Sequence, residues 1–127
     1  MKLKLPILLV SILITQHVFA SSNDDYSKIR ELQSIIDEKD NAQANENEFV
    51  KLHAGKSLSN QEKEESAQLY CLILKSELKM HEFMLSNPEF TKDLIGEMSN
   101  EDINTIEQKK LNHSKLEKAL SKTNHKC

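Results

Sequence analysis

Residues 59–88 of the chain read SNQEKEESAQLYCLILKSELKMHEFMLSNP and carry the signals of one long helix. Ser59 and Glu62 have the spacing of a capping box, in which each side chain bonds the backbone N–H of the other at a helix start. No glycine or proline follows until Pro88, which suits the first position of a new helix. Apolar residues in the second half cover more than one face, as in a helix that is contacted on several sides. We therefore predict a central helix over residues 60–86.

On the N-terminal side, the sequence predicts two helices separated by a loop. Apolar residues recur every three or four positions as far as Ile36, and this first helix is expected to end near Asp40. Residues 41–47 are polar and are predicted to form a loop. A short second helix is expected over residues 49–53, followed by Gly55 in the left-handed conformation that often ends a helix.

On the C-terminal side, two more helices and a tail are predicted. The segment after Pro88 has the length of a short helix that ends at Gly96. Ser99 and Asp102 form a second capping-box pattern, which predicts a last helix reaching about Ser121. Residues 122–127 are then left as a C-terminal tail.

Composition agrees with an all-α fold. The whole chain has two glycines and two prolines among 127 residues, too few for the turns of a β-sandwich or barrel. Residues 21–127 are long enough for one hydrophobic core and too short for two. We expect a single-domain bundle of four to five helices.

Residues 1–20 have the layout of a secretory signal peptide. Lys2 and Lys4 precede an apolar run. Ala20 then supplies a small residue at the expected cleavage position, just before the chain becomes polar. We expect cleavage near Ala20-Ser21 and a periplasmic or secreted protein. The apolar run is too short to span a bilayer, and no cysteine follows it to carry a lipid, so no stable membrane anchor is expected.

Charge and aromatic content disfavour nucleic acid as a partner. Without Lys2 and Lys4 the chain retains fifteen Lys and Arg against twenty Asp and Glu, a net charge of −5. Arg30 is the one arginine, and the aromatic residues do not alternate with basic ones, so phosphate forks and base-stacking platforms are not predicted. The expected partner is another protein.

The two cysteines, Cys71 and Cys127, predict a disulfide because an even count in an exported chain normally pairs. If the central and last helices are antiparallel neighbours, the last helix overshoots Cys71 by about 9 Å, and an extended six-residue tail is long enough to return. The alternative is a buried Cys71 with Cys127 free or bonded to another chain.

No pattern predicts catalysis, a cofactor or a metal. Glu77 with His81, and His125 with Cys127, have ligand chemistry but not the spacing of a known metal motif. The acidic pairs Glu64-Glu65 and Glu101-Asp102 lie near predicted helix starts, where the helix dipole favours negative charge. We expect a protein without enzymatic activity.

These observations favour an exported helical binding protein, for example an immunity or inhibitor protein that neutralises a toxin or cell-wall hydrolase. An acidic surface speeds encounter with a basic partner. The alternative is a periplasmic chaperone or envelope-stress adaptor, which would expose apolar helix faces to its clients. The acids expected to contact a partner are Glu46, Glu48, Glu64, Glu65, Glu101 and Asp102.

Overall fold

The computed structural model describes residues 23–127, and four helices with no strand contain 83% of them. In chain order these are α2 (Asn23–His53), α3 (Asn60–Ser86), α4 (Pro88–Ile95) and α5 (Asn100–Leu120). The predicted all-α fold is confirmed. No helix within this range has the length and apolarity needed to cross a membrane. The predicted signal peptide, residues 1–20, and the cleavage site before Ser21 lie outside the described residues.

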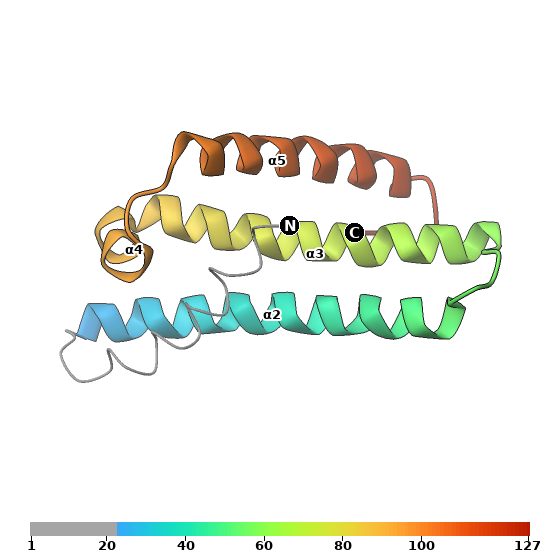
Figure 1. The fold of residues 1–127 in the computed structure, drawn as a ribbon, viewed down its shortest axis with the longest axis horizontal. Coiled ribbons are helices and arrows are strands. Elements are labelled where there is room, and N and C mark those ends of the chain that lie inside the picture. Colours follow the sequence, from blue (N-terminus) through green and yellow to red (C-terminus); the bar gives the residue numbers. More distant parts are fainter. Residues whose placement is uncertain (1–22) are drawn as a thin grey trace.

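Helix α3 is the centre of the fold. Figure 1 shows α2 and α5 on opposite sides of α3, and both pack against α3 while hardly contacting each other. Ion pairs mark two antiparallel alignments: Lys79 of α3 meets Glu38 of α2, and Glu77 of α3 meets Lys109 of α5. The result is a layer one helix thick, with α4 set across one end (Figure 1).

The predicted helix starts are confirmed in atomic detail. The Ser59 hydroxyl accepts from the Glu62 N–H, and the Glu62 carboxylate accepts from the Ser59 N–H, so the capping box before α3 is complete. Ser99 and Asp102 form the same arrangement before α5. Gly55 has the predicted left-handed backbone, with φ of 73°.

The predicted loop over residues 41–47 is wrong, and so is the separate short helix after it. Helix α2 continues through both for 31 residues. Its less exposed positions recur every three or four residues and include Lys39, Gln43 and Glu46. Long polar side chains can cover a partner helix with their aliphatic stems, so this contact face continues between Ile36 and Phe49 without a large apolar residue. A search for apolar periodicity therefore stops too early.

One apolar cluster of the core lies at the end of the layer that α4 covers. Leu32 and Ile36 of α2 pack with Met80 and Phe83 of α3, and all four are at most 5% exposed. The ring of Phe90 from α4 meets Phe83 edge to face, with ring centroids 5.9 Å apart. This cluster fixes α2, α3 and α4 relative to one another.

Candidate functional site

The C-terminal tail turns back along α3 after α5 ends at Leu120. His125 Nδ1 lies 3.4 Å from Glu64 Oε2, and the Gln68 side-chain amide donates to the backbone oxygen of Lys126. Cys127 then reaches Cys71. Successive tail residues thus contact successive turns of α3, and the tail follows the direction of that helix.

The Cys71–Cys127 disulfide is present, as the sequence predicts. Its Cα atoms are 5.7 Å apart, within the range that disulfides require. Cys71 is completely buried, whereas Cys127 is half-buried. Cys71 therefore lies inside the helix layer, whereas Cys127 lies at its surface with the rest of the tail.

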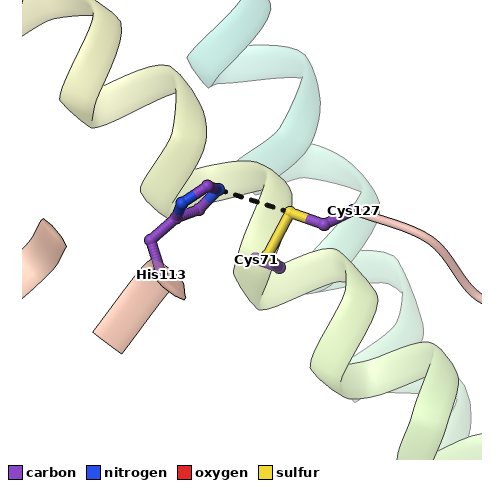
Figure 2. A group of neighbouring side chains, drawn as sticks. All are labelled: Cys71, His113 and Cys127. Carbon is purple, nitrogen blue, oxygen red and sulfur yellow. Dashed lines mark hydrogen bonds between the residues drawn. A yellow bond between two sulfur atoms is a disulfide. The ribbon is translucent and has the colours of Figure 1, made fainter. Parts of the chain in front are cut away.

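His113 of α5 completes a group of three around this bond (Figure 2). Its Nε2 lies 3.5 Å from the sulfur of Cys127, and the donor atoms of His113, Cys71 and Cys127 all lie within 4.8 Å of one another. A disulfide sulfur carries no proton, so Nε2–H is the donor in this contact. No other group of this kind occurs within residues 23–127.

The sequence analysis missed the position of His113, although one signal was available. If α3 and α5 are antiparallel from the Ser86 and Asn100 ends, residue 115 stands level with Cys71. His113 is within one helical turn of that level. The register of two helices, rather than a spacing within one, brings the histidine to the disulfide.

The metal set considered from sequence is not assembled. Glu77 forms an ion pair with Lys109, at 2.7 Å between Oε2 and Nζ, and both side chains are less than one-fifth exposed. His81 lies beside this pair, and both of its ring nitrogens are buried without a hydrogen-bond partner. Desolvation lowers the pKa of His81 and Lys109 lowers it further, against smaller opposing effects of Glu77 and Asp102.

The six acids predicted to contact a partner lie at two ends of the molecule. Glu46 and Glu48 are in the second half of α2, and Glu64 and Glu65 in the first turns of α3. Glu101 and Asp102 start α5, at the far end of α3.

Three of these six acids already have internal partners. Glu46 accepts a hydrogen bond from the Gln43 side-chain amide. Glu64 contacts His125 of the tail. Hydrogen bonds from the side chain and backbone of Ser99 lower the pKa of Asp102, so this carboxylate acts as a cap. Glu48, Glu65 and Glu101 are exposed.

A second group of acids lines an open groove between α2 and α3, with a volume of about 560 Å³. Glu31 and Glu38 come from α2 and Glu82 from α3. Lys79 pairs with Glu38, at 2.6 Å between Nζ and Oε2. Glu31 and Glu82 are exposed and have no ion pair or side-chain hydrogen bond within the described range. The sequence analysis did not select them, because neither lies in a motif.

Helix α2 is the most acidic element of the described chain. It contains eight acidic residues against four basic ones, whereas α5 contains four of each. The groove therefore lies along the acidic edge of the layer. Comparison of the chain with protein-family models, curated proteins and solved structures finds no match.

Proposed function

We propose that the chain is an exported helical protein without catalytic activity, which binds a basic partner protein along the groove between α2 and α3. Glu31 and Glu82, two carboxylates without partners on facing helices, are the observation that supports this most. A toxin or cell-wall hydrolase that acts on an anionic envelope is the class of partner that this charge fits.

The shape and charge of the groove favour a protein over a small ligand. The groove is open along its length, and small-molecule sites are usually enclosed and mostly apolar. A lysine or arginine of the partner between Glu31 and Glu82 would gain two carboxylates without breaking the Glu38–Lys79 pair. The remaining acids of α2 would accelerate encounter from a distance.

Capture of a partner is the direct test. Immobilised protein, with its disulfide intact, is exposed to periplasmic extract and to the medium of competing cells, and bound proteins are identified by mass spectrometry. The proposal expects a basic protein whose binding weakens as salt is raised. Capture of only acidic proteins, or of none, would contradict it.

Charge reversal locates the contact. Glu31→Lys with Glu82→Lys should weaken binding of the captured partner at least tenfold, about 1.4 kcal/mol. Glu107→Lys with Glu117→Lys on α5 changes the net charge equally and serves as the matched control. Equal losses in both variants would show that overall charge, and not the groove, attracts the partner.

The acids selected from sequence are tested in the same assay. Glu48→Lys in α2 with Glu65→Lys in α3 reverses two exposed acids away from the groove, near the loop that joins the two helices. If this variant loses more affinity than the groove variant, the contact lies near the tail and the groove assignment is wrong.

Export depends on residues 1–20 and has its own test. N-terminal sequencing of protein from the native host is expected to begin at Ser21. An intact Met1 form recovered from the cytosol would remove the proposed compartment and the class of partner with it.

A chaperone role is the second candidate, because large apolar side chains are exposed on all four helices. They are Tyr26, Val50, Leu52, Tyr70, Leu85, Ile95, Ile103 and Leu111. A chaperone should suppress aggregation of an unrelated unfolded client at low stoichiometry and bind a hydrophobic dye. If the protein fails both assays but still binds the basic partner, the chaperone role is ruled out and only the inhibitor proposal remains.

A further inference from the structure

We propose that reduction of the Cys71–Cys127 disulfide converts this group into a zinc site, with Cys71, Cys127 and His113 as ligands. Thiolate and imidazole groups are the common ligands of Zn²⁺ in proteins, whereas Mg²⁺ and Ca²⁺ prefer oxygen ligands. A water molecule in the fourth position would complete the tetrahedron. The inference is independent of the proposed function, because the acidic groove does not include these residues.

The distances around His113 match those of a zinc centre. With Zn–S of about 2.3 Å and Zn–N of about 2.0 Å, a tetrahedral site places sulfur and nitrogen about 3.5 Å apart and two sulfurs about 3.8 Å apart. His113 Nε2 is 3.5 Å from the Cys127 sulfur, and all three donor atoms lie within 4.8 Å. The cysteine Cα atoms, 5.7 Å apart, can support separated sulfurs after a rotation of the Cys127 side chain.

Two tail contacts would keep the ligands together once the covalent bond is broken. His125 remains beside Glu64, and Lys126 remains bonded to Gln68, immediately before Cys127 in the chain. The third ligand, His113, is carried by α5 and does not depend on the tail. Zinc therefore needs to order only the last residue, which limits the entropy lost on binding.

Access to the site comes from the tail side. Cys127 and His113 are half-buried, while Cys71 is completely buried beneath them. A metal ion would enter from solvent between the two half-buried ligands and reach the Cys71 thiolate at the bottom. The buried position of Cys71 limits the water around the bound metal.

The chemical step is a thiol–disulfide exchange with a dithiol as reductant. One thiolate of the dithiol attacks the accessible Cys127 sulfur, the bond between the two cysteine sulfurs breaks, and Cys71 leaves as a thiolate. The second thiol of the dithiol releases Cys127, and the dithiol departs as its own disulfide. Zn²⁺ then binds both thiolates and neutral Nε2, and the two protons of the dithiol pass to water.

The histidine must change tautomer between the two states. In the oxidised protein Nε2 carries the proton that faces sulfur, whereas a metal-bound Nε2 has none. The proton is then carried on Nδ1. ¹⁵N chemical shifts of the His113 ring report this change directly, independently of zinc affinity.

The test compares metal binding by oxidised and reduced full-length mature protein. Protein is reduced with a phosphine, separated from excess reagent without oxygen, and titrated with Zn²⁺ and with Co²⁺ as a spectroscopic probe. We expect one metal ion per reduced chain, a thiolate-to-cobalt charge-transfer band, and no such site in the oxidised chain. Equal binding by oxidised and reduced chains would overturn the proposal.

Matched histidine variants separate a ligand from a bystander. His113→Asn should lower zinc affinity of the reduced chain at least tenfold, whereas His81→Asn, about 15 Å further along the α3 axis than Cys71, should leave it unchanged. Both variants keep the disulfide, so their fold is verified in the oxidised state before reduction. If His113→Asn binds zinc as tightly as the wild type, the site is wrong.

Re-oxidation offers a second readout that does not require a stable variant. Bound zinc protects the two thiolates, so an equimolar amount should slow re-formation of the disulfide at least tenfold, and a chelator should restore the rate. Mg²⁺, which avoids thiolates, is the matched control. Re-oxidation at the same rate with zinc and with Mg²⁺ would contradict the proposal.

Discussion

The two ends of α3 are held by different kinds of chemistry. At its C-terminal end, Met80 and Phe83 are buried in an apolar cluster with α2 and α4. Toward its N-terminal end, the tail is attached by one disulfide at Cys71 and by polar contacts to Gln68 and Glu64. Apolar burial is diffuse and shared among many side chains, whereas the covalent attachment depends on one bond.

The difference follows from the composition of the two ends. The last three turns of α3 supply large apolar side chains, while its first turns are rich in Glu, Lys and Gln. A layer one helix thick buries less surface than a closed bundle, and small domains with limited cores commonly use a cross-link. The disulfide thus adds a covalent link toward the end of α3 where polar contacts hold the tail.

The largest expected effect comes from removing the disulfide. Its residues are 56 positions apart, and the chain-entropy model gives a loss of about 4 kcal/mol in the free energy of unfolding for a loop of this size. Cys127→Ser should show this loss in urea unfolding, and Cys71→Ser should lose more because its hydroxyl would be completely buried. A loss below about 1 kcal/mol in both variants would mean that the disulfide adds little to the stability of the fold.

A core truncation probes the other end. Leu32→Ala removes the most deeply buried side chain of the apolar cluster and should cost about 3 kcal/mol. Hydrogen exchange should accelerate first in α4 and the adjoining turns of α3, and in Cys127→Ser first in the tail and the end of α5. The same pattern in both variants would contradict the contrast between the two ends.

The two capping boxes offer a smaller, paired comparison. Ser59→Ala and Ser99→Ala each remove a side-chain acceptor at a helix start and should each cost about 1 kcal/mol. Ser114→Ala, at an exposed position within α5, is the control and should change stability little. A markedly larger loss for Ser59→Ala would show that the disulfide-bonded end depends more strongly on its cap.

The smallest expected effect is a pH dependence from His81. Burial lowers its pKa in the folded protein below the ordinary value of 6.5, so the unfolded chain takes up a proton first as the pH falls. Stability should therefore decrease as the pH falls through about 6.5, and not on the alkaline side. His81→Leu should flatten this part of the curve in urea unfolding measured at several pH values. If His81→Leu leaves the curve of stability against pH unchanged, other titratable groups cause the pH dependence.

Local signals in the sequence predict the helix boundaries well where capping residues are present. Ser59, Ser99 and Pro88 are at the predicted helix starts, and Gly55 follows α2 as expected. Asn87, the residue before Pro88, does not cap α4, because its side-chain amide donates to the Phe83 oxygen.

The errors and omissions arise where partners come from another helix. Gln43 is half-buried in α2, and the only apolar residues of that turn are the small side chains of Ala42 and Ala44. His113 meets the disulfide because α5 and α3 align in one particular register. Glu31 and Glu82 line the same groove because of the α2–α3 alignment, which no spacing within one helix indicates. Cysteine pairing was predictable because it needs only two residues and a tail of sufficient length.

The Cys71–Cys127 bond also divides the chain topologically. It closes a ring that contains most of α3, all of α4 and α5, and the tail, whereas α2 lies outside the ring. A protease that cuts between α4 and α5 releases nothing, because both new ends remain joined through sulfur. A cut within residues 54–59 frees α2 from every covalent link to the ring. The acidic helix is thus the one helix of the described fold that lies wholly outside the ring, and after such a cut only its packing against α3 and α4 would hold it in place.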